Sequence, residues 1–273
     1  MALRFGAARQ AALRFVLCYN SRASFRCVLL GKHLFMTWSI IARDASGAFG
    51  IAISSRFFAV GALCPHARSG VGAVATQALV NPMYAQAALD ALAGGMAPEQ
   101  VIAQVTAADT GQAHRQVHMI DAQGRTAAHT GASCIDWCGH MAGDDFSVAG
   151  NMLAGPQVIA STAEAYRAND AVPFAERLIA ALAAGDASGG DKRGKQAAAL
   201  LIYTTEDYPA LDIRVDDHLE PIEELQRLYR KSLERYQPFT ACLPSRARPA
   251  GITDRAVIEA EIERFQAGRG AAR

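Results

Sequence analysis

The sequence predicts an α+β fold of four layers, an αββα sandwich in which two antiparallel sheets lie face to face between helices. Two observations lead to this fold class. Strand-like runs are joined by tight turns, as in hairpins, which excludes a purely parallel sheet. Helices come in pairs between groups of strands, which suits a helical layer on each outer face.

The first hairpin is the clearest of the expected elements. Asp44–Gly47 is rich in turn residues and separates two apolar runs. Pro82 suits the first turn of a helix, and Gly94-Gly95 suits its end. In chain order, we expect strands over 38–44, 48–54 and 71–77, followed by helices over 82–93 and 98–107.

The rest of the chain continues this alternation. A second hairpin turns at Ala122–Gly124, and the segment 221–236 has apolar residues along one helical face. In chain order, we expect strands over 116–121, 125–130 and 146–150, helices over 157–168 and 173–184, strands over 197–203 and 211–215, and a helix over 221–236.

Composition narrows the functional classes. The chain has 273 residues, a net charge of +1 and no basic stripe, which argues against nucleic-acid binding. No apolar run approaches the ~20 residues that a bilayer-spanning helix needs. The six cysteines are irregularly spaced, so we expect reduced thiols and a cytoplasmic location.

The N-terminal segment differs from the rest. Residues 1–35 contain six Arg or Lys residues and no acid. They could be a transit peptide, a poor secretory signal, an ordinary extension, or sequence upstream of a true start at Met36. We favour the last, because Met36 directly precedes the first strand. The expected domains are thus an extension over 1–35, a domain over 36–236, and a loop and helix over 237–273.

Thr37 is the strongest candidate for chemistry. If the working chain begins after Met36, Thr37 has a free amine beside its hydroxyl. The hydroxyl is then a nucleophile, and the amine, with a reference pKa of ~8, is its base. Because Thr is also a common strand residue, its position after Met36 supports this prediction more than its type does.

Two arginines are candidates for holding a carboxylate. Arg56 follows the second strand, where it could bind a carboxylate or lower the pKa of a neighbour. Arg68 shares a strand face with His66. The alternatives are a surface arginine flanked by core Phe residues and a pair of solvated basic residues, respectively.

Three further candidates lie where the strand over 71–77 meets the next helix. Exposed amides near Thr76 and Gln77, beside a helix N-terminus, suit an oxyanion or a carboxylate. Asn81 has an equally good structural role as the N-cap of that helix.

Two later loops add candidates. Asn151 could donate to an oxyanion, with a left-handed turn residue as the alternative. We expect Asp191, Arg193 and Gln196 to shape the far wall of a site, although a solvated loop has the same composition. The segment 134–140 contains two cysteines and a histidine but lacks a second ligand pair, so packing is favoured over zinc binding.

Several separate motifs resemble one family. Together they are similar to the bacterial "domain of unknown function 1028" family, usually grouped with the N-terminal-nucleophile (Ntn) hydrolases. The resemblance covers about residues 36–236 and implies an αββα sandwich and amide-bond hydrolysis. Members often carry Lys where this chain has Arg56, and a guanidinium cannot replace a deprotonatable amine. The matching segments are 36–44, 55–61, 70–77, 150–155, 189–196 and 212–218.

The prediction is an Ntn-type amidohydrolase that cleaves a small amide or peptide-like substrate through an acyl-enzyme on Thr37. Asn151 or the amides near Gln77 would hold the oxyanion, and Arg56 and Arg68 would tune the amine or bind a carboxylate. No metal or organic cofactor is required. The alternatives are a non-catalytic protein that binds a small acidic metabolite and a pseudoenzyme subunit. The apolar face of 221–236 suggests a homo-oligomer, and packing within the domain explains it equally well.

Overall fold

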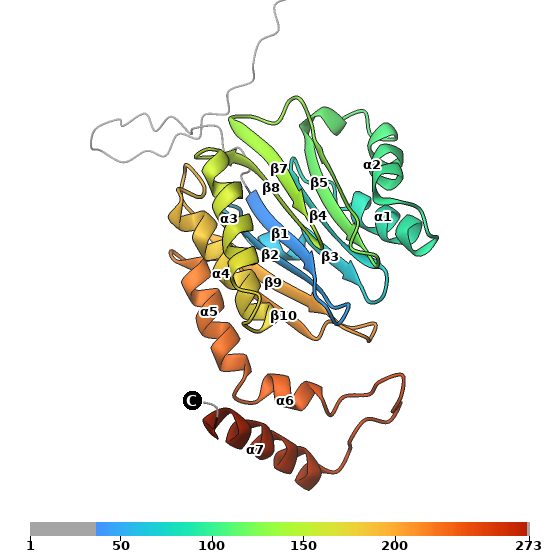
Figure 1. Cartoon of the computed structure of the whole chain (residues 1–273), viewed down its shortest axis with the longest axis vertical. Helices are drawn as coiled ribbons and strands as arrows, with labels where there is room; N and C mark the ends of the chain where they lie inside the picture. The colour runs from blue at the N-terminus through green and yellow to red at the C-terminus, as the bar shows by residue number, and fades with distance from the viewer. Residues whose placement is uncertain (1–36, 272–273) are drawn as a thin grey trace, which may run out of the picture. The chain divides into compact units, whose positions relative to one another are not determined.

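Two antiparallel sheets lie face to face between two helical layers in the computed structural model, which describes residues 37–271 (Figure 1). The αββα prediction is therefore confirmed. The six-stranded sheet has the order β10-β9-β2-β1-β8-β7 and the four-stranded sheet the order β3-β4-β5-β6. The strands are β1 Thr37–Arg43, β2 Phe49–Ser55, β3 Pro65–Arg68, β4 Gly72–Ala78, β5 Arg115–Asp121, β6 Thr126–Thr130, β7 Trp137–Gly143, β8 Phe146–Leu153, β9 Ala197–Tyr203 and β10 Leu211–Val215.

The helices divide between the two outer faces. One pair packs on the four-stranded sheet and three helices pack on the six-stranded sheet (Figure 1). The first group is α1 Met83–Ala93 and α2 Pro98–Ala107, and the second is α3 Pro156–Ala168, α4 Phe174–Ala187 and α5 Pro221–Ser232. Three short helices and the C-terminal helix complete the described chain, namely η1 Val60–Ala62, η2 Gln112–His114, α6 Tyr236–Thr240 and α7 Arg255–Ala271. No helix within 37–271 is both long and apolar enough to cross a membrane.

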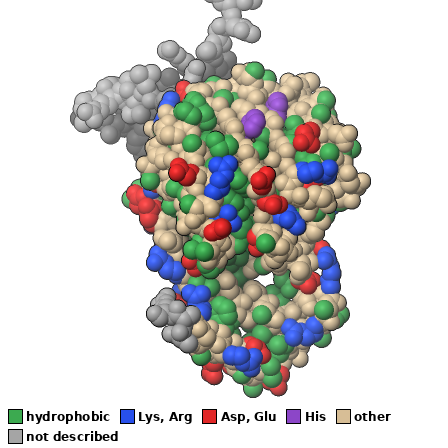
Figure 2. All heavy atoms as spheres, viewed as in Figure 1, with side chains coloured by type: hydrophobic (Ala, Val, Ile, Leu, Met, Phe, Trp, Pro, Cys, Tyr) green, Lys and Arg blue, Asp and Glu red, His purple; other side chains and the backbone are tan. Residues whose placement is uncertain are grey.

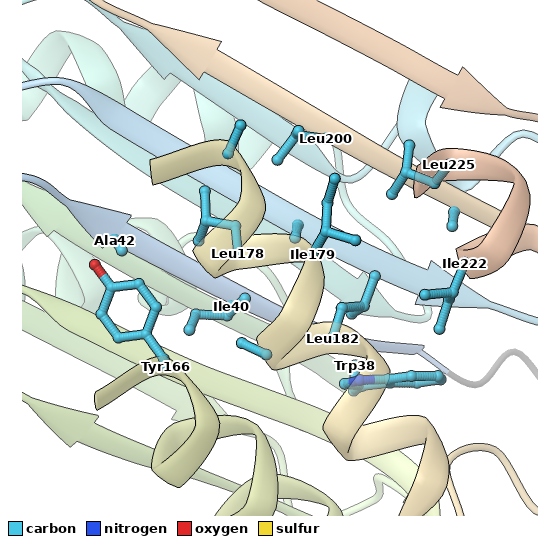
Figure 3. Packing of buried hydrophobic residues seen from close by; sticks show 14 of the residues in the cluster. Trp38, Ile40, Ala42, Tyr166, Leu178, Ile179, Leu182, Leu200, Ile222 and Leu225 are labelled. Carbon is cyan, nitrogen blue, oxygen red and sulfur yellow. The ribbon is translucent and has the colours of Figure 1, made fainter. Parts of the chain in front are cut away.

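Strand alternation in β1 assigns each residue to one of two cores. Trp38 and Ile40 point toward the helices, where they pack with Leu178 of α4 (Figure 3). Thr37 and Ser39 point the other way, into the space between the sheets, where they bond to side chains of β2, β4 and β5. The sequence around Thr37 therefore contributes both to the core beneath the helices and to the space between the two sheets, which we call the interlayer.

The interlayer has an apolar half and a polar half. Ile41, Phe49 and Ile51 of the large sheet meet Ala75 and Ile120 of the small sheet in the apolar half. The other half, which begins at Thr37, is lined by hydroxyl, amide and imidazole side chains. Because buried polar groups require partners, this half is held by side-chain hydrogen bonds as well as by packing.

Several elements differ from the sequence prediction. The strand β3 was considered only as the strand face that His66 and Arg68 share. The strand β7 was not expected, and it is an edge strand with mostly half-buried residues and no run of large apolar side chains. The helix α5 ends at Ser232, before the expected end, because the amides of Leu233 and Glu234 bond to carbonyls three residues back.

The apolar face of α5 is covered within the chain itself. Ile222, Leu225 and Tyr229 are buried in the core beneath the large sheet. This face therefore gives no support to a homo-oligomer, which stays a prediction. The expectations for residues 1–35 and for Met36 lie outside the described residues. Figure 2 shows basic and acidic side chains interspersed over the face in view, in keeping with a net charge of +1.

Candidate functional site

Thr37 opens β1 between the two strands that carry its nearest partners. In the sheet register it lies opposite Ser55 of β2 on one side and Asn151 of β8 on the other. Its Oγ1 donates a hydrogen bond to Ser55 Oγ at 3.1 Å. Thr37 is only 3% exposed, yet it lines a cavity of about 200 Å³ at the edge of the interlayer. The hydroxyl is thus held in place beside a small cavity that is partly open to solvent.

The cavity beside Thr37 is walled mainly by apolar side chains. Phe57, Cys64, Leu79 and Val80 contribute most of this wall, and Gln77 and Arg115 add polar groups. Burial raises the pKa of the Cys64 thiol to about 12, so this cysteine stays protonated at neutral pH. A protonated thiol is a poor nucleophile, which leaves the Thr37 hydroxyl as the candidate in this cavity.

A buried histidine anchors the polar half of the interlayer. His118 Nδ1 lies 3.0 Å from Ser147 Oγ, and its Nε2 lies 2.8 Å from Ser39 Oγ. Ser39 donates its own proton to Gln77 Oε1 at 2.7 Å. Because a hydroxyl has a single proton, Ser39 must accept from His118, which fixes the imidazole proton on Nε2 and makes Nδ1 the acceptor of the Ser147 proton.

Full burial keeps His118 neutral. Its pKa falls from the ordinary 6.5 to about 3, chiefly because burial disfavours the charged form and secondly because of nearby His140. A neutral imidazole can accept at one nitrogen while it donates at the other. His118 therefore serves as a fixed link between the sheets at neutral pH, because it joins β5 to β1 and β8.

The hydrogen bonds continue from Gln77 to Thr37 through two more amides. Gln77 Nε2 donates to Gln116 Oε1 at 2.8 Å, and Asn151 Nδ2 donates to the same oxygen at 3.0 Å. Asn151 Nδ2 also donates to the Thr37 carbonyl at 3.3 Å. Gln116 Nε2 in turn donates to the Gly150 carbonyl at 2.9 Å. Residues from both sheets are thereby bonded into one network that ends at Thr37.

Asn151 has an open acceptor and no open donor. Both N–H groups of its amide are used, by Gln116 Oε1 and by the Thr37 carbonyl. Its Oδ1 is buried and has no hydrogen-bond partner among the described residues. An oxyanion needs donors, so this geometry does not suit the oxyanion role predicted for Asn151. It suits an acceptor for an N–H group beside Thr37.

The residues directly after Gln77 and Asn151 have a left-handed backbone conformation. Ala78, after Gln77, has φ 67°, and Met152, after Asn151, has φ 56°. A side chain in this region costs roughly 1–2 kcal/mol relative to the right-handed conformation. The strained residues are the last residue of β4 and the second-last residue of β8, next to the polar half of the interlayer. Such a location is typical of functional sites.

Arg115, the first residue of β5, lines the cavity, and its side chain is held by hydrogen bonds to its neighbours. Its Nε donates to Asp109 Oδ2 at 3.0 Å and its Nη1 to the Leu79 carbonyl at 2.7 Å. Asp109 also accepts from Tyr84 Oη at 2.8 Å and from the Gly111 amide at 2.7 Å. Donation by Arg115 is the largest of the effects that hold the pKa of Asp109 well below its usual range. This ion pair fixes the guanidinium at the cavity.

The loop that follows β2 and the loop before β9 meet at the same end of the large sheet as Thr37. The guanidinium of Arg56 donates to the Arg193 carbonyl. Asp191 Oδ1 accepts from the Arg193 amide at 2.7 Å, and Gln196 Nε2 donates to Asp217 at 3.0 Å. These predicted site residues are thus near the end of β1, but none of them lines the cavity of Thr37.

Arg68 is not brought to the site. It lies opposite Gly72, at the far end of β4 from Gln77, because β3 and β4 run antiparallel. Its Nη2 pairs with Asp90 of α1 at 2.8 Å. The sequence prediction placed it at the site from its strand face alone, which does not specify the end of the sheet.

Thr76 and Asn81 shape the turn into α1. The Thr76 hydroxyl bonds to the backbone of Asn81, and Asn81 Oδ1 accepts from the Met83 amide at 3.2 Å. The Thr76 amide is also used, by the Cys64 carbonyl at 3.1 Å. The N-cap of α1 is Pro82 and not Asn81 as considered, so Asn81 has a structural role in the turn before the helix. Gln77 alone of these three residues lines the cavity.

Sequence reasoning missed several residues of this site. Ser39, His118 and Gln116 are polar residues at alternate positions of otherwise apolar strands, which was a readable signal. Arg115 and Ser55 gave no comparable signal, because their roles depend on pairing with distant strands.

A larger hollow lies away from Thr37 and is lined mainly by charged side chains. It measures about 700 Å³ and lies between α5 and α7. Two of its basic side chains form ion pairs with neighbours, Arg227 with Glu224 at 2.7 Å and Lys231 with Glu234. No residue with a candidate chemical role lines it, so we place the functional site at Thr37.

The chain is similar to known proteins in sequence and in structure. Residues 37–225 match the model of a family of unknown function, DUF1028. A solved structure of a DUF1028 protein from Silicibacter pomeroyi is 30% identical, with a TM-score of 0.74, over 80% of this chain and 100% of that one. The chain is also similar to Anbu, an ancestral beta-subunit from Yersinia bercovieri, at 13% identity and a TM-score of 0.33, over 76% of this chain and 98% of that one. No curated protein matched.

Proposed function

Since this chain belongs to the DUF1028 family, whose description names no reaction, we propose from its site that it is an amidohydrolase with Thr37 as N-terminal nucleophile. The observation that supports this most is the position of the Thr37 hydroxyl, which lines a small cavity and is held 3.1 Å from Ser55. The match to the family model also begins at residue 37.

The reaction requires a free amine on Thr37. The amine takes the hydroxyl proton as Oγ1 bonds to the substrate carbonyl carbon, and it then gives that proton to the leaving nitrogen as the C–N bond breaks. Water next attacks the resulting ester, which releases a carboxylic acid and restores the hydroxyl. No ionisable side chain of the described residues bonds to the Thr37 hydroxyl, so the amine is the candidate base.

Neighbouring side chains have distinct roles in this proposal. Ser55 orients the nucleophile through its hydrogen bond. Gln77 has one amide N–H bonded to Gln116, and its second N–H is the candidate donor to the oxyanion. The open Oδ1 of Asn151 accepts from the Thr37 amine or from the substrate amide.

The test combines N-terminal analysis with covalent trapping. We would determine the intact mass and N-terminal sequence of the purified protein and treat it with a hydroxyl-reactive acylating probe. The proposal predicts a chain that begins at Thr37 and a probe adduct on this residue. Thr37→Ala should lose the adduct, whereas Thr37→Ser should keep it. A free Thr37 that is not labelled, or equal labelling of Thr37→Ala, would contradict the proposal.

Binding without turnover is the second candidate. It is favoured by the hydrogen bonding of Thr37, whose hydroxyl donates to another hydroxyl and so has no base unless its amine is free. A chain that keeps a residue before Thr37 would still have the cavity. This function predicts stabilisation by a small ligand and no covalent adduct.

A further inference from the structure

We infer that the cavity beside Thr37 binds an acyl group that ends in a carboxylate, and that Arg115 is the residue that recognises this carboxylate. The inference rests on the proposed function, because it specifies the substrate class of the same site. It assigns the carboxylate to an arginine other than Arg56 and Arg68, neither of which lines the cavity.

The guanidinium of Arg115 has donors to spare. Two of its five N–H groups are used within residues 37–271, one by Asp109 and one by the Leu79 carbonyl. Leu79 and Arg115 both line the cavity, and this second bond joins them. The remaining donors can form the two parallel bonds that a guanidinium makes with a carboxylate.

The position of Arg115 is fixed before any ligand binds. Asp109, which holds its Nε, is itself bonded to Tyr84, Asn81 and the Gly111 amide. The Arg115 side chain is 23% exposed and the Asp109 side chain 16% exposed, so the pair is partly shielded from water. An arginine held in this way loses little conformational freedom on binding, which favours a charged ligand of defined geometry.

The size and lining of the cavity limit the rest of the acyl group. Its volume of about 200 Å³ equals roughly seven water molecules at ~30 Å³ each. Apart from Thr37, Gln77 and Arg115 the lining is mainly apolar, with Phe57, Leu79 and Val80. The ligand that fits these features is a short aliphatic chain with a carbonyl at one end and a carboxylate at the other. The inferred substrates are amides of short dicarboxylic acids.

The test compares glutarate with glutaramide, its uncharged diamide, by isothermal titration of the full chain carrying Thr37→Ala. This variant cannot use Thr37 as a nucleophile, so the result does not depend on turnover. We expect glutarate to bind at least ten-fold more tightly than glutaramide, with the preference weakened by salt. Equal affinities, or no binding of glutarate, would overturn the inference while leaving amide hydrolysis by Thr37 open.

Arginine variants test the assignment to Arg115. In the Thr37→Ala background, Arg115→Gln should lose the preference for glutarate, and the matched controls Arg56→Gln and Arg68→Gln should keep it. Because Arg115→Gln leaves Asp109 without its main partner, the double change Arg115→Gln with Asp109→Asn is measured as well. A preference that survives in a folded Arg115 variant, or that is lost in a control, would refute the assignment.

Discussion

The buried imidazole of His118 predicts how stability changes with pH. In the folded protein its pKa is about 3, because burial and, to a lesser degree, His140 disfavour the charged form, whereas an unfolded histidine has a pKa near 6.5. The unfolded chain therefore binds a proton that the folded chain does not bind between these values. The contribution of His118 to stability is present above pH 6.5 and is lost as the pH falls toward 3.

The size of this loss follows from the two pKa values. Between pH 7 and pH 5 the unfolded histidine becomes almost fully protonated while His118 stays neutral, which lowers the free energy of unfolding by about 2 kcal/mol. Urea denaturation at both pH values measures the total change. In His118→Gln, which has no titratable group, the change between pH 7 and pH 5 should be about 2 kcal/mol smaller than in the wild type.

Two further measurements make this prediction specific. His66→Gln, on β3 and outside the network, controls for the removal of an imidazole in general. In the folded wild type, NMR should show no titration of the His118 ring between pH 8 and pH 5. A ring titration near 6.5, or the same pH dependence in wild type and His118→Gln, would refute the reasoning.

Three further predictions concern the neighbourhood of Thr37 and the packing beneath it. Ser55→Ala removes the acceptor of the Thr37 hydroxyl, so acylation by a probe should slow about ten- to hundred-fold; an unchanged rate would remove Ser55 from the site. Ala78→Gly relieves a left-handed alanine and should raise the free energy of unfolding by about 1 kcal/mol, and a loss of stability would show that the residue is unstrained. Gly50→Ala places a Cβ 2.4 Å from Leu178 Cδ1 and should destabilise by about 1–3 kcal/mol in thermal denaturation, whereas Gly268→Ala, with no atom nearby, should not.

The layers could be predicted because they follow from patterns of residues that are close together in the sequence. The hairpin turn at Asp44–Gly47 and the paired helices were sufficient for the αββα arrangement. The edge strand β7 could not be predicted, since it has few large apolar residues and is held by pairing with β8. Its stability comes from a partner strand and not from its own sequence.

The candidate site was predictable only in part, for a related reason. Thr37 and Gln77 were identified from local context, and both line the cavity. The register of β3 against β4 places Arg68 at the wrong end of the sheet, and the register of β5 against β4 brings Arg115 opposite Ala78. Neither register follows from spacing along the chain, so the sequence prediction included Arg68, which lies away from the cavity, and omitted Arg115, which lines it.

The polar half of the interlayer also determines where β1 can pair. A shift of β1 by one residue would exchange its two faces, because side chains alternate along a strand. Trp38 would then lie among the amides next to Gln116, and Ser39 would lie beneath α4 without a partner. Both changes bury groups in unsuitable surroundings, so misregistered pairings are disfavoured from either face. The residues that follow Thr37 thereby determine where Thr37 lies. They keep it at the cavity because a one-residue shift of β1 is unfavourable on both faces of the strand.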